Sequence, residues 1–465
     1  MKRVMKRLKP NILPAFELLY LGCAFFLVFE IAVPLPVSVY KGLYVALFFV
    51  LMLRAVVMRE GMALFLPRYL RIGRVALPVL LLLGYLFLDA VGLLYSPNAS
   101  YAAHKYYVVV PMLFFLMPTL CFAKDEAHLD RLYRTLAVSG VAVVLFSLSN
   151  YFIYEFIPLP YLRRLSTIAD YNRYAENLFV ALALAGYYII GTKYKRIHRT
   201  LLLCAVIILL GTAITLSGSR RTYLLMFPAL AVLLLYRLFY VVRYSATERA
   251  AFMRLTMGAG WCICALLVMF AAKSGFERYS DIKYQQEIAQ GGEVSEENNV
   301  DTVIDSISTG GMFEKRAVIW RTAINTAVDY DFLDIIIGRG SGYDSYLYDH
   351  TPDPQLTEMY KHIEDKPKNW MNPHNFLLAD LLNGGAVRLA VSLALAASVA
   401  ASLVMLFIHR PHRALGLITA MALVYFNAFI SGRYGFVYDK FYYILLACIM
   451  AEHALAKDAR PTMGR

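Results

Sequence analysis

Cysteines are few in this chain, and their positions exclude two kinds of stabilising site. The sequence has 6 cysteines in 465 residues, all in or beside long apolar runs: Cys23, Cys121, Cys204, Cys262, Cys264 and Cys448. Cys262 and Cys264 have no neighbouring His or Cys at the spacing of zinc ligands, so we expect no structural zinc site. The polar segment 273–373 contains no cysteine, which excludes a disulfide bond within it.

Charged residues are also scarce, and apolar ones take their place. Charged residues make up 17% of the chain, hydrophobic residues 59%, and the mean hydropathy is +0.54. A soluble domain averages about 25% charged residues. Many apolar runs approach the roughly 20 residues that cross a bilayer. We therefore expect an all-α polytopic membrane protein with about twelve membrane-spanning helices. The expected spans lie near residues 12–33, 38–57, 75–95, 106–123, 135–158, 175–191, 200–216, 222–241, 255–272, 388–408, 414–430 and 440–456.

The distribution of basic residues predicts the orientation in the membrane. With a cytoplasmic N-terminus, the predicted inner segments hold 24 Lys and Arg and the short outer connections hold 8. This excess satisfies the positive-inside rule. Both termini are then expected in the cytoplasm and the segment 273–373 outside. The basic start with its apolar run resembles a signal peptide, but no small-residue cleavage site follows, so we interpret it as the first span.

The net charge of +13 is unevenly distributed. Segment 273–373 holds 10 basic and 18 acidic residues, a net charge of −8, whereas the rest of the chain holds 36 and 15, a net charge of +21. The basic residues are thus expected to contact anionic membrane lipids. No basic stretch interleaved with aromatic residues indicates nucleic-acid binding.

Three parts are expected along the chain. Residues 1–272 form a membrane domain with nine spans, residues 273–387 a loop domain, and residues 388–465 a membrane domain with three spans and a cytoplasmic tail. Within the loop, the spacing of apolar residues predicts a helix over 313–328, with Val318, Ile319, Ala323 and Ile324 on its apolar face. A short interfacial helix over 374–383 is expected to end in a break at the two glycines 384–385 before the next span.

The end of the loop carries the most suggestive pair of polar residues, His374 and Asn375. A histidine can accept a proton near neutral pH, so His374 is a candidate base; the alternative is that it only caps the following helix. Asn375 is a good N-cap residue, and it is equally suited to orient the imidazole or to bond a sugar. Both interpretations of each residue stay open at this point.

Several arginines lie in short outer connections, against the topological bias. They are Arg163 and Arg164 before the sixth span, and Arg220 and Arg221 after the seventh. A guanidinium group binds phosphate through a planar pair of donors. Each arginine alone could instead be a side chain extended from a helix end toward water. Together they favour an outer site for a lipid diphosphate.

Four motifs in order resemble the O-antigen ligase and O-antigen polymerase superfamily of bacterial envelope glycosyltransferases. They are Leu-Ser-Gly-Ser-Arg at 216–220, Arg-Ala-Val-Ile-Trp at 316–320, Gly-Arg-Gly-Ser-Gly-Tyr at 338–343 and His-Asn-Phe-Leu-Leu at 374–378. The third motif lacks the context of a nucleotide-binding loop and is expected to be a structural turn. The resemblance covers about residues 160–410. The chain departs from the pattern after the His-Asn helix, where Arg388 stands near the place of a second glycine.

The resemblance implies a fold and an activity. Such proteins are inverting glycosyltransferases of the bacterial inner membrane that have a GT-C-like fold and use no metal or other cofactor. The donor is a glycan on undecaprenyl diphosphate at the periplasmic face. A ligase transfers it to lipid A–core, and a polymerase transfers it to another lipid-linked repeat unit. The single large periplasmic loop favours the ligase.

The motifs also assign roles to residues. Arg220 and Arg316 match the family pattern and are expected to stabilise the charge that develops on the leaving diphosphate, with Arg164 as a third cation. Arg163 and Arg221 are expected to help bind the donor. Arg316 has an alternative role as an exposed helix charge paired with Glu314 or another loop carboxylate.

A polysaccharide or lipid-glycan transporter is the competing class. Transporters place charged residues near the bilayer midplane and often repeat one half in the other. Here Lys41, Arg54, Arg237 and Arg388 lie near the ends of predicted spans, and one large loop breaks any symmetry between the halves. The sequence therefore favours the enzyme.

Overall fold

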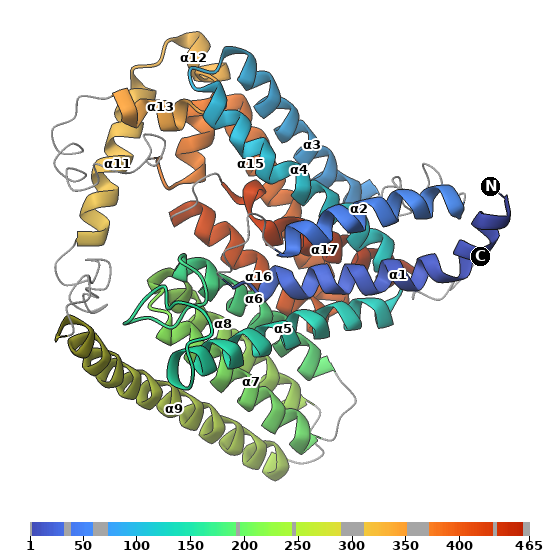
Figure 1. Ribbon diagram of the computed structural model, residues 1–465, viewed down its shortest axis with the longest axis vertical. Helices are drawn as coiled ribbons and strands as arrows, with labels where there is room; N and C mark the ends of the chain where they lie inside the picture. The colour runs from blue at the N-terminus through green and yellow to red at the C-terminus, as the bar shows by residue number, and fades with distance from the viewer. Residues whose placement is uncertain are drawn as a thin grey trace. The chain divides into compact units, whose positions relative to one another are not determined.

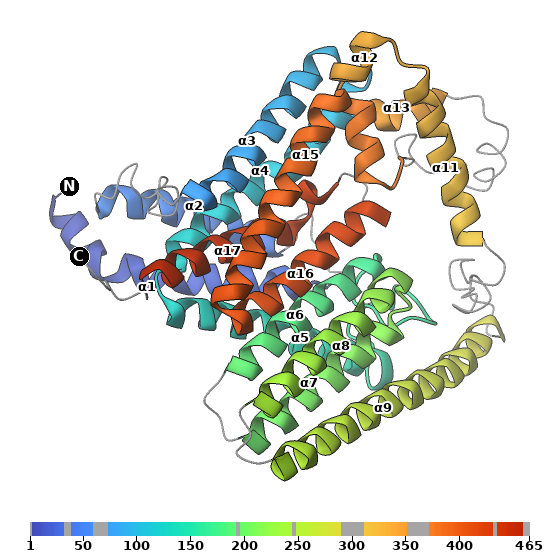
Figure 2. The same ribbon diagram turned by 180° about the vertical axis from the view of Figure 1, so that it is seen from behind.

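In the part of the chain that it describes, the computed structural model of the protein consists of helices joined by loops and turns (Figures 1 and 2). The described residues are 2–31, 39–58, 73–191, 196–243, 248–289, 311–350, 372–430 and 435–458. No strand occurs in these ranges, which confirms the all-α class. By packing, the helices form two compact units, which we describe separately.

Five helices among the described residues are long and apolar enough to cross a membrane. They include Pro10–Val28, Ala76–Tyr95, Glu126–Phe152, Phe376–His409 and Pro411–Ile430; Gly42–Val57 and Leu201–Leu216 are shorter apolar helices. Helices also occupy the other predicted spans, and the count of twelve stays a prediction. Only 28% of the apolar window in Phe376–His409 is buried, so most of that surface is left for lipid, as expected of a membrane protein.

The first unit comprises Met1–Gly61, Phe122–Val300 and His409–Leu423. Its helices are α1 (Lys2–Val28), α2 (Val39–Val57), α5 (Glu126–Phe152), α6 (Tyr171–Gly191), α7 (Arg196–Leu216), α8 (Arg220–Arg243), α9 (Glu248–Ala289) and the first part of α16 (Pro411–Ile430). Helices α5, α6 and α7 pack against one another, and α9 lies along α7 and α8 (Figure 1). At 42 residues, α9 reaches well beyond its apolar part.

The second unit comprises Met62–Cys121, Asp301–Ile408 and Val424–Arg465. Its elements are α3 (Gly73–Gly92), η3 (Leu93–Tyr95), α4 (Ala99–Phe122), α11 (Gly311–Val328), α12 (Phe332–Ile337), α13 (Tyr343–His350), α15 (Phe376–His409), the end of α16, η6 (Phe436–Tyr438) and α17 (Lys440–Asp458). Helix α17 is apolar on every side and buried over most of its length, as befits a central helix. Residues 290–310 and 351–371 of the predicted loop domain lie outside the described ranges.

Helix α11 confirms the helix predicted over 313–328, but its buried face is narrower than expected. Ile319 and Ala323, four residues apart, are buried in a small core with tyrosines of the following segment. Ile324 is 48% exposed, so its place on the apolar face was wrong. One residue along a helix turns the side chain by about 100°, which moves Ile324 away from the stripe that contains Ala323.

The predicted break in α15 is also confirmed. Gly384 (φ −136°, ψ 15°) and Gly385 (φ 60°, ψ −161°) leave helical geometry, and the chain resumes its helix directly afterwards. The glycine turn 338–342 packs against the break. The Arg339 N–H donates to Leu382 O and the Gly340 N–H to Asn383 O, both at 3.0 Å. A Cβ atom on Gly385 would lie 2.5 Å from the Ile336 carbonyl. The glycine turn is therefore structural, as the sequence predicts.

Candidate functional site

The predicted site residues fall into two groups, and each group lies within one unit. Arg163, Arg164, Arg220 and Arg221 belong to the first unit. Arg316, His374 and Asn375 belong to the second. We describe the two groups in turn as the arginine group and the histidine group.

The loop that carries Arg163 and Arg164 connects α5 to α6 and is fixed by hydrogen bonds to backbone carbonyl groups. The Leu165 N–H donates to Leu216 O, the last residue of α7, at 3.0 Å. The Thr167 hydroxyl donates to Glu30 O, just after α1, at 2.6 Å. The first bond holds the loop against the α7–α8 turn, which is the Leu-Ser-Gly-Ser-Arg motif, and the second holds it against the end of α1.

Arg164 lies directly over that turn. Gly218 adopts φ 74°, a conformation that glycine tolerates best, and the Arg164 side chain passes 3.6 Å from the position a Cβ of Gly218 would occupy. On its other side the guanidinium stacks 3.8 Å from the ring centroid of Tyr171. The turn itself leads into α8, where the Ser219 hydroxyl donates to Asn172 Oδ1 at 2.9 Å.

The first turn of α8 has an electrostatic character suited to anions. Arg220 and Arg221 occupy it, and it contains no acidic residue. Backbone N–H groups at a helix N-terminus carry a partial positive charge that attracts phosphate. Arg164, Arg220 and the start of α8 thus concentrate positive charge around one turn.

The arginines differ in what balances their charge. Arg163 is paired with Asp281 of α9 at 2.8 Å, and Arg221 with Glu176 of α6 at 2.5 Å. Among the described residues, Arg164 has no carboxylate within ion-pair distance, and its buried Nε has no hydrogen-bond partner. A half-buried guanidinium in this state favours an anionic ligand. The structure thus distinguishes Arg164 from its neighbour in sequence.

The histidine group begins with a cap on α15. Asn375 Oδ1 accepts the N–H of Leu377 at 2.9 Å and that of Leu378 at 3.4 Å, which is the N-cap geometry. Asn372 Oδ1 accepts the His374 N–H at 2.9 Å. His374 has φ 50° and is, among the described residues, the one non-glycine with a positive φ. Strained backbone of this kind often accompanies a functional residue.

Helix α11 supports this segment from the side. Trp320 Nε1 donates to Pro373 O at 2.9 Å, one residue before His374. Arg316 is one turn earlier on α11, on the same side of the helix as Trp320. Arg316 thus lies on α11, and His374 and Asn375 lie at the start of α15. The hydrogen bond from Trp320 to Pro373 joins these two segments. No local sequence pattern indicates the contact of Trp320 with Pro373.

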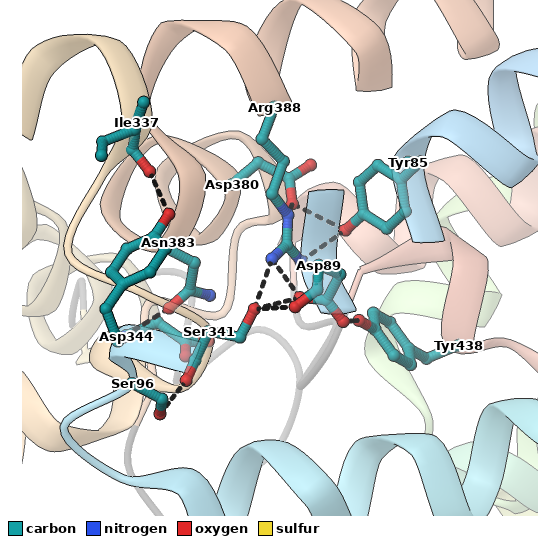
Figure 3. A network of polar contacts seen from close by, with 11 residues as sticks. Tyr85, Asp89, Ser96, Ile337, Ser341, Asp344, Asp380, Asn383, Arg388 and Tyr438 are labelled. Atoms are coloured by element: carbon teal, nitrogen blue, oxygen red, sulfur yellow. Dashed lines mark hydrogen bonds and ion pairs between the residues drawn. The ribbon is translucent and has the colours of Figure 1, made fainter. Parts of the chain in front are cut away.

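The sequence also missed a buried polar network beside the histidine group. Asp89 of α3 and Asp380 of α15 both bond to Arg388, within the apolar interior of the second unit (Figure 3). Arg388 is buried, whereas the sequence indicated only a charge near a span end. The sequence did contain a signal for this network. Asp89, Asp380 and Arg388 are isolated charges in apolar runs, and such charges need partners.

The described residues contain no group of three or more His, Cys, Asp or Glu side chains placed to hold a metal ion. The expected absence of a cofactor is therefore left as a prediction.

Comparison with known proteins identifies the domain that contains most of these residues. No curated protein matches the chain. Residues 204–393 match the model of a family described as O-antigen ligase. This stretch runs from α7 into α15 and includes Arg220, Arg316, His374 and Asn375, whereas Arg163 and Arg164 precede it. The chain therefore carries a domain of the O-antigen ligase and O-antigen polymerase superfamily.

Proposed function

We propose that the protein is an O-antigen ligase-like glycosyltransferase of the bacterial inner membrane. It transfers a glycan from undecaprenyl diphosphate to lipid A–core at the periplasmic face, with inversion at the anomeric carbon and without a metal. The family match supports the class of reaction. The observation that carries the donor assignment is Arg164, which lies over the family motif at Gly218 and has, among the described residues, no carboxylate within ion-pair distance and no hydrogen-bond partner for its buried Nε.

The donor diphosphate suits the arginine group. Phosphate oxygens accept two parallel hydrogen bonds from a guanidinium, and the N-terminus of α8 adds partial positive charge. Arg163 and Arg221 already pair with carboxylates, so we assign them a supporting role at the edge of the diphosphate site. Arg164 and Arg220 are the side chains we assign to direct contact.

The transfer step uses the histidine group. The acceptor hydroxyl oxygen attacks the anomeric carbon, the bond from that carbon to the diphosphate oxygen breaks, and the electron pair leaves with undecaprenyl diphosphate. His374 takes the proton from the attacking hydroxyl. Arg220 and Arg316 stabilise the negative charge that grows on the leaving group. Asn375 uses Oδ1 to cap α15, which leaves its amide nitrogen for a sugar hydroxyl.

Variants of Arg164 test the donor assignment in a strain that lacks the chromosomal gene, with lipopolysaccharide examined on gels. Arg164→Met should abolish polymer-bearing lipopolysaccharide, because an oxyanion donor contributes about 10²-fold or more to rate. Arg163→Lys is the matched control: it retains a charge for Asp281 and should keep most of the polymer.

The same strain distinguishes the acceptors. Loss of all polymer-bearing lipopolysaccharide, with lipid-linked polymer accumulating, indicates a ligase. A core that carries one repeat unit indicates a polymerase that joins lipid-linked units. Unchanged polymer in Arg164→Met, at a wild-type level of membrane protein, would remove Arg164 from the mechanism.

A further inference from the structure

Arg388 stands at the centre of a closed polar network in the second unit. Its guanidinium bonds to Asp89 Oδ1, to Asp380 Oδ1 at 3.0 Å, to Ser341 Oγ at 3.3 Å and to the Tyr85 hydroxyl at 2.8 Å. Tyr85 in turn donates to Asp380 at 2.7 Å. Figure 3 shows these side chains converging on the guanidinium from separate elements. One arginine therefore ties together two carboxylates that are both fully enclosed.

The network joins four parts of the unit. Tyr85 and Asp89 come from α3, and Ser341 comes from the glycine turn, where its hydroxyl donates to Asp89 Oδ1 at 2.6 Å. Tyr438 of η6 completes the network by donating to Asp89 Oδ2 at 2.7 Å. Asp380 and Arg388 both belong to α15, but they lie on opposite sides of its break.

The break in α15 permits the bond between Asp380 and Arg388. Eight residues in a straight helix rise about 12 Å, a long span for two side chains to bridge. Here the Arg388 side chain folds back across Gly384, and its Cβ and Cδ lie 2.4 Å from where a Cβ of Gly384 would be. The missing side chain at Gly384 is thus the space through which Arg388 reaches Asp380.

The segment of α15 before the break follows directly on His374 and Asn375. It runs from the Asn375 cap through Phe376 to Asn383. A helix of that length is about 12 Å long, so a tilt of about 10° at the break would displace its start by about 2 Å. Misplacement of a reacting group by about 1 Å can cost on the order of 10²-fold in rate.

We propose that Arg388 is a positioning residue: it locks the angle between the two halves of α15 and so fixes the place of His374 and Asn375. Its side chain does not contact the substrate. The expected effect of Arg388 on glycan transfer rests on the proposed function. The fixed angle between the two halves of α15 does not rest on it, and is measured separately.

Spin labels on the two halves of α15 measure the locking directly. Cysteines replace Leu377 and Val404 in full-length protein whose native cysteines are substituted, and pulsed electron resonance gives the distance distribution. The wild-type distribution should be narrow. Arg388→Lys should broaden it, because one ammonium group cannot hold both carboxylates and Tyr85 in the arginine geometry. An unchanged narrow distribution in Arg388→Lys would overturn the proposal.

Gly384→Ala provides a second variant that changes no charge. Gly384 has a φ of −136°, which an alanine can adopt. The added methyl group, however, would collide with the Arg388 side chain and displace it. The distribution should broaden as in Arg388→Lys. Gly84→Ala in α3 is the matched control, since nothing lies within 4 Å of its added Cβ, and it should behave as wild type.

Transfer kinetics then connect the lock to activity. Arg388→Lys and Gly384→Ala should lower kcat about 10-fold to 10²-fold and leave KM for the lipid-linked donor within about twofold. Wild-type kcat in a variant with a broadened distribution would overturn the positioning role. If the wild-type protein transfers no glycan at all, the proposed function fails, while the distance measurement still decides whether Arg388 locks α15.

Discussion

Arginine side chains in this protein differ by the partners that surround them. Arg388 is buried and bonded to several side chains, Arg163 and Arg221 pair with carboxylates, and Arg164 stacks on an aromatic ring and has no described carboxylate within ion-pair distance. The same residue type thus occurs as part of a buried network, as an ion pair and as a guanidinium stacked on an aromatic ring. Their surroundings, and not their identity, indicate which role each one has.

Asn375 permits a test that separates its two roles. Asn375→Asp keeps the Oδ1 acceptor at a helix N-terminus, where a negative charge is favourable, but loses the amide donor. We expect wild-type thermal stability and a decrease in transfer of about tenfold or less, the value of one hydrogen bond. Stability follows from melting in detergent, and transfer from product formation.

Asn375→Ala provides the comparison for that variant. It removes the cap and should lower stability by about 1 kcal/mol. If Asn375→Asp transfers glycan at the wild-type rate, the residue is a cap and does not contact the sugar.

At the scale of elements, the histidine group depends on how the glycine turn and the α15 break fit together. Gly338 and Gly385 approach so closely that a Cβ on either would lie 2.5 Å from backbone atoms of the other segment. Both residues also have a positive φ. This contact, the Trp320 bond to Pro373 and the Arg388 network hold the same short segment from three directions.

Gly385→Ala should therefore destabilise the second unit. The strained φ and the contact with the Ile336 carbonyl together should cost about 2 kcal/mol or more. The expected result is a lower melting temperature in detergent and less protein in the membrane. Gly84→Ala, with open space around its Cβ, should show neither change; a Gly385→Ala protein as stable as that control would contradict the tight packing described for the break.

The sequence predicted elements better than contacts. Apolar periodicity located α11, and paired glycines located the break in α15, because both signals are local. The bond between Asp89 and Arg388 joins residues 299 positions apart, and no local pattern predicts such a pair. Arg164 was predicted to be a cation near phosphate, but the pairing that distinguishes it from Arg163 depends on Asp281, a residue of the distant helix α9.

At the scale of the molecule, apolar helices with exposed outer surfaces are typical of a membrane protein, and residues 204–393 match the O-antigen ligase family. Its two packing units each hold one group of candidate site residues. We propose that the arginine group binds the diphosphate, and that the histidine group supplies His374 as the base and Arg316 as a cation for the leaving group. Arg164→Met and His374→Ala should therefore both fail in the same assay.

Glycan transfer by the purified full-length protein tests the central claim most directly. The protein is reconstituted in liposomes with undecaprenyl-diphosphate-linked glycan and with either lipid A–core or a second lipid-linked unit as acceptor. Wild type should form glycan-bearing lipid A–core and release undecaprenyl diphosphate, and His374→Ala should lower that rate by about 10²-fold or more. Product only with the second lipid-linked unit would assign a polymerase, and no transfer to either acceptor, or an unchanged rate in His374→Ala, would contradict the proposed mechanism.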